Sequence, residues 1–179
     1  MSGMDDDIFE AFIEQLRRYV RERLIPAEEE VIASDHIPDA ILNEMRDMGL
    51  FGLTIPVEYG GAGMSISQYI ETVKQLSYAA PAYRSTVSIN IGMTGSAIKN
   101  FGTEEQKRRY MMKMYAGEWA GTMCLTEPGA GSDVGALKTT ARRLPDGKFL
   151  ITGTKCFISA GDHDLASNIV HPVLARIEG

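Results

Sequence analysis

The stretch Met123–Asp133 (MCLTEPGAGSD) marks the point at which this 179-residue chain changes its character. Before this stretch, apolar residues recur at helical spacing, and after it short apolar runs alternate with turn residues. Inside it, an apolar run leads into a Gly- and Pro-rich loop that carries small hydroxyl residues. Glycines let a backbone approach a ligand closely, and successive N–H groups can form an anion-binding concavity. Glycine spacing alone fits an ordinary tight turn as well, and no G-x-G-x-x-G pattern opens a helix after a strand.

The chain upstream of this stretch is predicted to be helical. Residues 8–20 carry an amphipathic pattern, and Gly49 is placed to end a second helix as its C′ residue. Capping boxes at 65–68 and 103–106 begin two further helices, and another helix is expected from about residue 84 to residue 100. The apolar stripe expected after the first box consists of Ile66, Tyr69, Ile70, Val73 and Leu76.

The chain downstream is predicted to form strands. Leu137–Leu144 and Lys148–Ser159 flank Pro145-Asp146-Gly147, which is a strong hairpin signal. Asn168–Ile177 is expected to be one more strand. Pro172 lies within it and lacks the N–H that a central strand needs, so this strand should be an edge, bulged or disturbed.

These patterns predict an α+β chain with a boundary near residue 120. Residues 1–119 should form an N-terminal all-α helical domain. Residues 120–179 should form an incomplete antiparallel, barrel-like β domain. An incomplete sheet exposes an edge and apolar faces, which favours oligomerisation or aggregation.

Composition excludes several classes of protein. The net charge of −6 and the pI near 5.1 disfavour nucleic-acid binding, because a negative surface repels phosphate backbones. No apolar run approaches the ~20 residues that a membrane span requires. The acidic start lacks the basic region of a signal peptide, and two cysteines without CxxC spacing favour reduced thiols. A cytoplasmic location is therefore expected.

Four segments in the right order resemble the acyl-CoA dehydrogenase family. Met123–Asp133 resembles the family signature, and Gly153–Gly161 (GTKCFISAG) is similar to its second flavin-contact strand. Gly52–Gly63 and Phe101–Lys107 are similar to parts of its helical domain. The resemblance implies an oxidoreductase that binds FAD and dehydrogenates the α,β bond of an acyl-CoA thioester. It also implies electron-transfer flavoprotein as the electron acceptor, a homo-oligomer (dimer or tetramer) and a role in fatty acid metabolism.

The resemblance assigns site residues one by one. Phe157 stands where the family usually has an aromatic residue on the flavin face away from substrate. Ser159 replaces the threonine whose hydroxyl contacts flavin N5. The residues expected to contact the cofactor are Met123, Leu125, Thr126, Gly131, Ser132, Phe157 and Ser159. Ser132 and Met93 are the candidates for contact with substrate, although the apolar residues around Met93 fit a helical core equally well.

No catalytic base is expected in this chain. Glu127 is a carboxylate inside the signature, and the resemblance implies that its role is to hold the loop. In the family the base is a glutamate from the C-terminal helical domain or a nearby helix. The chain stops at Gly179, where the family's β domain would continue. The C-terminal helical domain is therefore expected to be absent, and the fragment is expected to be inactive alone.

No metal site is expected, since the ligand types of Asp162-His163-Asp164 are adjacent on a loop and rarely converge on one ion. His36 and His171 have no evident partner in sequence. Cys124 and Cys156 are expected to pack as small apolar groups.

Two other readings stay open. The chain could belong to a flavin monooxygenase or nitroalkane-oxidising relative on the same scaffold. It could also be a non-catalytic module that binds an acyl-CoA or a partner subunit, which would be colourless and would never bleach a redox dye.

Overall fold

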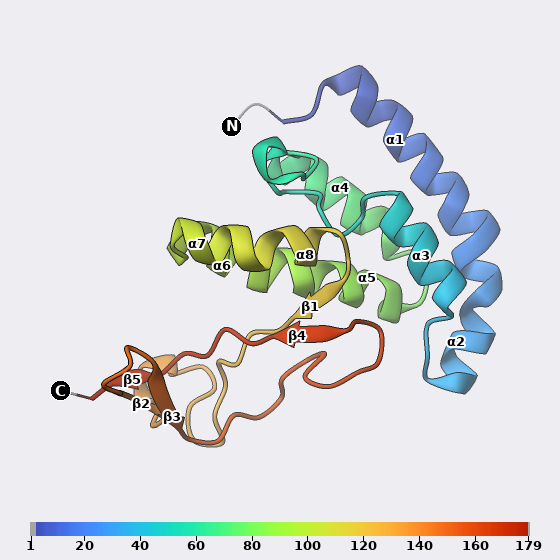
Figure 1. The fold of residues 1–179 in the computed structure, drawn as a ribbon. Coiled ribbons are helices and arrows are strands. Elements are labelled where there is room, and N and C mark those ends of the chain that lie inside the picture. The colour runs from blue at the N-terminus through green and yellow to red at the C-terminus, as the bar shows by residue number, and fades with distance from the viewer. Residues whose placement is uncertain (1–2, 179) are drawn as a thin grey trace.

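The computed structural model describes residues 3–178 as a helical part followed by a smaller sheet region (Figure 1). The helical elements are α1 (Asp6–Tyr19), η1 (Val20–Leu24), η2 (Ile25–Ala27), α2 (Glu28–Ser34), α3 (Asp39–Asp47), η3 (Val57–Tyr59), α4 (Ile66–Leu76), α5 (Pro81–Ser88), η4 (Ile89–Gly95), α6 (Ser96–Phe101), α7 (Glu104–Gln106), η5 (Lys107–Met111), α8 (Met112–Tyr115) and η6 (Val134–Ala136). The strands are β1 (Trp119–Gly121), β2 (Thr140–Arg143), β3 (Phe149–Thr152), β4 (Asn168–Val170) and β5 (Arg176–Ile177). Within residues 3–178, no helix is both long and apolar enough to cross a bilayer.

Local signals set the ends of several helices. The side chain of Ser65 accepts a hydrogen bond from the N–H of Gln68, and the side-chain oxygen of Gln68 accepts one from the N–H of Ser65, which completes the first expected capping box. Thr103 and Gln106 form the second box in the same way. Gly49 follows α3 with a φ of +70°, the left-handed conformation that glycine adopts without strain, so its expected role as C′ residue is confirmed.

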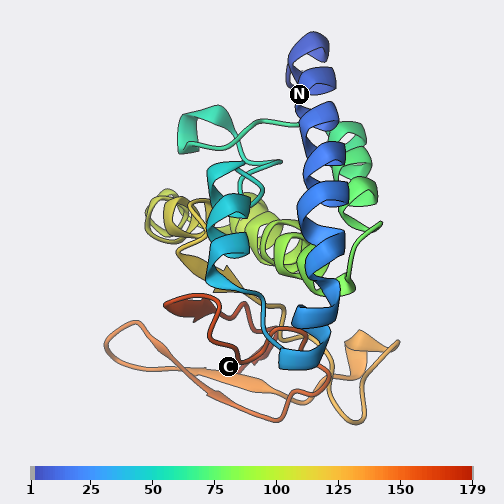
Figure 2. The same ribbon diagram turned by 90° about the vertical axis from the view of Figure 1, so that its right-hand side faces the viewer.

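The core of the helical part combines α1 to α5. Leu16, Leu24, Met45, Leu76 and Tyr83 have no exposed surface, and they belong to one cluster of buried side chains. Figure 2 shows α1 lying along this bundle, with the sheet region below it.

The expected apolar stripe on α4 is wrong in part. Ile66 and Ile70 are 68% and 59% exposed, whereas Gln68 and Thr72 are buried. Gln68 is buried because its amide exchanges two hydrogen bonds with the backbone of Met4, at 3.1 and 2.8 Å. The hydroxyl of Thr72 donates to the carbonyl of Gln68 at 2.9 Å. Hydrogen-bonded polar side chains therefore occupy the buried face of α4 that the apolar periodicity predicted for Ile66 and Ile70.

The sheet region contains the expected hairpin but is mixed in direction. β2 and β3 pair antiparallel around the predicted turn, while β1 pairs with β4, and β2 with β5, in parallel. The strand predicted at 148–159 ends already at Thr152. After Gly121 the buried apolar side chains of the described chain are Ala130, Leu137 and Ala141. Small side chains dominate this set, so the sheet region has little core of its own.

The strand predicted at 168–177 is broken at Pro172, as expected for that residue. Thr122 donates to the carbonyl of Val170 at 3.0 Å, so the parallel register would have residue 172 donate to the carbonyl of Thr122. Proline has no N–H, and the hydroxyl of Thr94 on η4 donates to that carbonyl in its place. Pairing then resumes through the bridge between Cys124 and Val173.

Candidate functional site

The structure brings the two segments of the expected site side by side. The N–H of Cys156 donates to the carbonyl of Thr126 at 3.0 Å. One position earlier, the ammonium of Lys155 donates to the carbonyl of Leu125, also at 3.0 Å. The segment 153–159 therefore lies along the start of the loop that carries the family signature.

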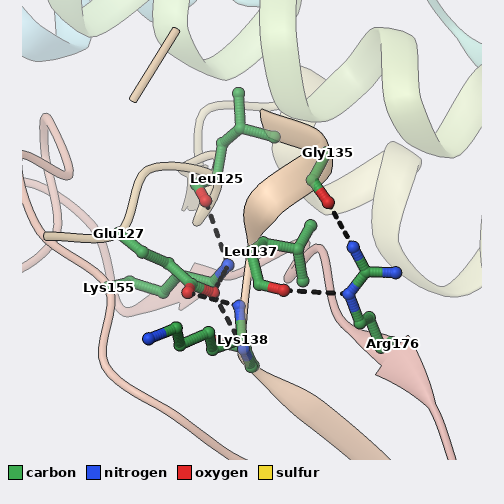
Figure 3. A network of polar contacts seen from close by, with 8 residues as sticks. Leu125, Glu127, Gly135, Leu137, Lys138, Lys155 and Arg176 are labelled. Atoms are coloured by element: carbon green, nitrogen blue, oxygen red, sulfur yellow. Dashed lines mark hydrogen bonds and ion pairs between the residues drawn. The ribbon is translucent and has the colours of Figure 1, made fainter. Parts of the chain in front are cut away.

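Glu127 is the centre of the polar network that fixes this loop (Figure 3). Its carboxylate accepts hydrogen bonds from the N–H groups of Lys138 and Thr139 at 2.6 and 3.0 Å. It also accepts one from the ammonium of Lys155 at 2.8 Å, and both side chains are mostly buried. The Lys155 hydrogen bond, followed by those from residues 139 and 138, lowers the pKa of Glu127 to about 2. The carboxylate is thus held ionised and occupied, in agreement with its expected structural role.

Lys155 was not identified from the sequence as part of the site. Its position directly before the apolar run Cys156–Ile158, inside the strand predicted at 148–159, is the signal that could have found it, because a charged residue in an apolar strand needs a partner. Its side chain links the signature loop to the second segment at two points, the Leu125 carbonyl and the Glu127 carboxylate. It therefore determines how the two halves of the site face each other.

A second anchor holds the chain just after the signature loop. Arg176 on β5 donates from Nε to the carbonyl of Leu137 at 2.9 Å and from Nη2 to the carbonyl of Gly135 (Figure 3). These carbonyls belong to the turn that leads from the loop into β2. The planar guanidinium thereby joins the last strand to the exit of the loop.

The residues expected to contact a cofactor differ in their exposure. Met123, Leu125 and Thr126 are half-buried, while Gly131 and Ser132 are exposed on the loop. A Cβ added at Gly131 would meet nothing within 4 Å, so this part of the loop faces open space. The loop can therefore be approached from outside at its Gly-Ser end.

Phe157 is almost fully exposed. Its side chain is 92% exposed, and its φ is +56°. A non-glycine residue in the left-handed region costs about 1–3 kcal/mol and persists only where its surroundings hold it there. Ala160, three residues later, has a φ of +55° as well. This aromatic side chain is presented to the outside by an unusual backbone conformation rather than by packing.

A pocket of about 600 Å³ lies between the helical part and the segment that follows Phe157. Its walls include Val31, Ile37, Leu42, Ala80, Ile89, Asn90, Trp119, Gly121, Ser159, Ala160 and Leu165. Ser159 is at this pocket, whereas Met93 is not among its lining residues and is 42% exposed on η4. Ile91 is buried in the core, whereas Ile89 lines the pocket. The helix that was expected to line an acyl pocket therefore contributes residues to both the pocket and the core.

Two histidines have partners that the sequence did not suggest. Nδ1 of His171 lies 2.8 Å from the hydroxyl of Thr122 and 4.0 Å from the sulfur of Cys124. His36 lies 3.4 Å from the carboxylate of Asp164. The expectation that both histidines lack partners is wrong, because each partner is distant in sequence. Across residues 3–178, no three metal-ligating side chains of the His, Cys, Asp and Glu types converge.

Comparison with known proteins identifies the family. The model of the acyl-CoA dehydrogenase N-terminal domain matches residues 7–118, and that of the acyl-CoA dehydrogenase middle domain matches residues 122–176. The chain therefore belongs to the acyl-CoA dehydrogenase family.

Individual relatives carry the same family name. An acyl-CoA dehydrogenase of Bacillus subtilis is 36% identical over 146 residues, which are 82% of this chain and 38% of that protein. A butyryl-CoA dehydrogenase of Syntrophomonas wolfei is 56% identical over 82 residues, which are 45% of this chain and 13% of that protein. The crystal structure of a glutaryl-CoA dehydrogenase from Mycobacterium smegmatis in complex with FADH2 matches with a TM-score of 0.84 and 30% identity, over 98% of this chain and 44% of that one. The chain thus spans less than half the length of each of these relatives.

Proposed function

We propose that this chain provides the helical part and one half of the flavin site of an FAD-dependent acyl-CoA dehydrogenase. The observation that carries the proposal is the side-by-side placement of the signature loop and the segment 153–159, joined through Lys155. The structure of the Mycobacterium smegmatis relative, which holds FADH2, supports the choice of cofactor.

The residues present fit a flavin in chemical type. Phe157 offers a flat apolar face that nothing in the described chain covers, as its 92% exposure demonstrates. Thr126 and Ser159 offer hydroxyl groups, and Gly131 with Ser132 leaves an open backbone suited to phosphate oxygens. An aromatic platform beside hydroxyl and backbone donors matches a ring system with a polar edge and a diphosphate.

The chemistry of the reaction is divided between cofactor and protein. FAD, when bound, supplies the acceptor for the hydride that leaves the β carbon of the thioester. Phe157 would hold the ring of the bound cofactor, and Ser132 would bind its phosphates. Removal of the α proton needs a free carboxylate. Glu127 is unsuitable because three donors occupy it and its pKa is lowered to about 2.

We therefore propose that the chain alone does not dehydrogenate acyl-CoA. The whole protein would take an acyl-CoA as substrate, pass electrons to electron-transfer flavoprotein, form a homo-oligomer and act in the cytoplasm in fatty acid metabolism. Reduction of a redox dye by the purified chain in the presence of FAD and butyryl-CoA would contradict the proposed inactivity.

Titration with FAD tests the flavin site directly. Binding to the chain should quench flavin fluorescence, and Phe157→Ala should weaken binding about tenfold because an aromatic stacking surface is lost. Phe101→Ala is the matched control, since Phe101 is 89% exposed on α6, away from the signature loop. Equal FAD affinity of the two variants would contradict the assignment of Phe157.

The second candidate function is a non-catalytic acyl-CoA-binding module. The pocket of about 600 Å³ favours it, because residues of this chain alone line that volume. Such a module would bind an acyl-CoA in calorimetry and stay colourless after dialysis against FAD. A yellow protein with a flavin absorbance spectrum would instead support the flavin site.

A further inference from the structure

The segment 157–166 has few hydrogen bonds of its own, and we call it the docking segment. At its two flanks the backbone is fixed, by the bond from Cys156 to Thr126 and by the bond from Ser167 to the carbonyl of Glu118 at 3.1 Å. Between these flanks the described segment has one internal bond between backbone groups, from Gly161 to the carbonyl of Ile158 at 3.2 Å, and one from the N–H of Leu165 to Nδ1 of His163 at 3.2 Å. In Figure 1 this part of the chain, between β3 and β4, runs beneath the helical part.

The docking segment nevertheless holds an unusual conformation. Phe157 and Ala160 both have positive φ values, and a side chain that is 92% exposed cannot fix its own backbone by packing. Contacts from outside must therefore hold the segment. Those contacts come from the helical part.

Arg46, in the last turn of α3, makes the most direct of these contacts. Its Nη2 donates to the carbonyl of Leu165 at 3.0 Å, across 119 positions of sequence. Its Nε donates to the carbonyl of Gly117 at 3.1 Å, and its Nη1 donates to the side chain of Asn43 at 2.7 Å. All three guanidinium nitrogens are thus engaged, and two separate segments, at Gly117 and Leu165, are joined to α3 through one planar group.

The surroundings of Arg46 leave room for this side chain. Gly117 has a φ of +69°, and a Cβ added there would lie 2.8 Å from Cγ of Arg46. The side chain of Leu165 packs on the helical core beside it, and His36 lies 3.4 Å from Asp164. No acidic partner pairs with Arg46 among residues 3–178, so its role is to place carbonyl groups rather than to neutralise a charge.

We infer that Arg46 is a positioning residue that anchors the docking segment to the helical part and thereby sets where Phe157 and Ser159 stand. The effect on the cofactor rests on the proposed flavin function. The anchoring itself does not, because it depends only on hydrogen bonds within this chain. Lysine cannot replace the arginine, since one ammonium cannot reach three acceptors in a plane.

The test compares Arg46→Lys with Arg23→Lys in the full 179-residue chain. Arg23 is the matched control because its guanidinium bonds Glu44 inside the helical part and does not touch the docking segment. Hydrogen exchange followed by mass spectrometry should show about tenfold faster exchange of peptides covering 157–166 in Arg46→Lys, because a charge-assisted hydrogen bond is lost. Exchange in α1 and α4 should stay unchanged in both variants.

A second readout separates positioning from loss of structure. Arg46→Ala should bind FAD about tenfold more weakly, with a shifted visible spectrum, and millimolar ethylguanidinium should restore both. A variant damaged only in its fold would not recover on addition of a small cation. Unchanged exchange in the docking segment, or no recovery where the wild-type chain binds FAD, would overturn the inference.

The outcome also distinguishes this inference from the proposed function. If the wild-type chain binds no FAD, the flavin proposal fails, and the exchange experiment alone decides whether Arg46 anchors the segment. If FAD binds equally to wild type and Arg46→Lys while exchange increases, anchoring is supported and its effect on the cofactor is refuted.

Discussion

The helical part and the sheet region of this chain are held together by different means. The helical part has a cluster of large side chains without exposed surface, among them Leu16, Leu24 and Tyr83. The sheet region buries few and mostly small apolar side chains, and its loops are fixed by the carboxylate of Glu127 and the guanidinium of Arg176. Stability of the first region comes from removal of apolar surface from water, and that of the second from satisfied polar groups.

Because of this difference, substitutions in the apolar core and substitutions of polar contacts should affect different parts of the chain. A cavity in the helical core should weaken the whole chain, because that core supports both regions. Loss of one polar contact in the sheet region should loosen a particular loop and leave the helices intact.

Truncation of the helical core should have the largest effect. Leu24→Ala removes a side chain without exposed surface and should lower the free energy of unfolding by about 2–5 kcal/mol. Urea unfolding followed by circular dichroism measures it. Ile8→Ala is the control, because Ile8 is 60% exposed on α1 and should change stability by less than about 0.5 kcal/mol. An equal loss of unfolding free energy in Leu24→Ala and Ile8→Ala would contradict the view that the apolar core stabilises the helical part.

The contact between the two regions should come next. Thr94→Val deprives the buried carbonyl of Thr122 of its donor and should cost about 1–3 kcal/mol. Pro172→Ala restores the missing backbone N–H, so the cost of Thr94→Val should be smaller in the Pro172→Ala background. A double-mutant cycle in urea measures this coupling. Simple additivity of the two substitutions would show that Pro172 is not the reason for the Thr94 hydroxyl.

Acidification should loosen the sheet region locally. The pKa of Glu127 is lowered from its ordinary value of 4.5 to about 2, so the folded state favours the carboxylate. Its stabilising contribution is therefore complete above about pH 4.5 and is lost as the pH falls through about 2. Amide exchange at Lys138 and Thr139 should accelerate in this window. Glu127→Gln should exchange fast at every pH, and a pH dependence that survives in this variant would assign the effect to another group.

Charge placed on the exposed edge strand should have the smallest effect on folding. Ile151 on β3 is 48% exposed, and Ile151→Lys should change the free energy of unfolding by less than about 0.5 kcal/mol. Self-association at high concentration should decrease, because charged residues protect sheet edges from pairing. Sedimentation velocity measures this, and association that is unaffected by the lysine would place the contact elsewhere.

The sequence allowed prediction of those parts of the fold that depend on residues close together in the sequence. The capping boxes at Ser65 and Thr103, the C′ glycine Gly49 and the hairpin turn between β2 and β3 all follow from residues a few positions apart. Which residues of α4 are buried could not be predicted, because the buried side chain of Gln68 is stabilised by a hydrogen bond to Met4, 64 positions away. The parallel pairing of β1 with β4 has no local signal either.

The candidate site shows the same division. The signature loop could be predicted because it is one contiguous motif, and the structural role of Glu127 was implied by the family resemblance of that motif, since its partners lie 11 to 28 positions away. The groups that Lys155 and Arg46 join across the site could not, since these partners lie 28 to 119 positions away in sequence. Whether Met123, Ser132 and their neighbours contact a flavin stays a prediction.

The parallel pair β1 and β4 also has a consequence for the order in which the chain folds. Its contacts join distant positions, such as Thr122 and His171, which are 49 residues apart. Closing a loop of that length costs roughly 3 kcal/mol of chain entropy before any contact compensates for it. During synthesis the helices can assemble from short-range contacts, whereas β1 has to wait until β4 has been made. The first strand of the sheet region is thus among the last elements to acquire its hydrogen bonds.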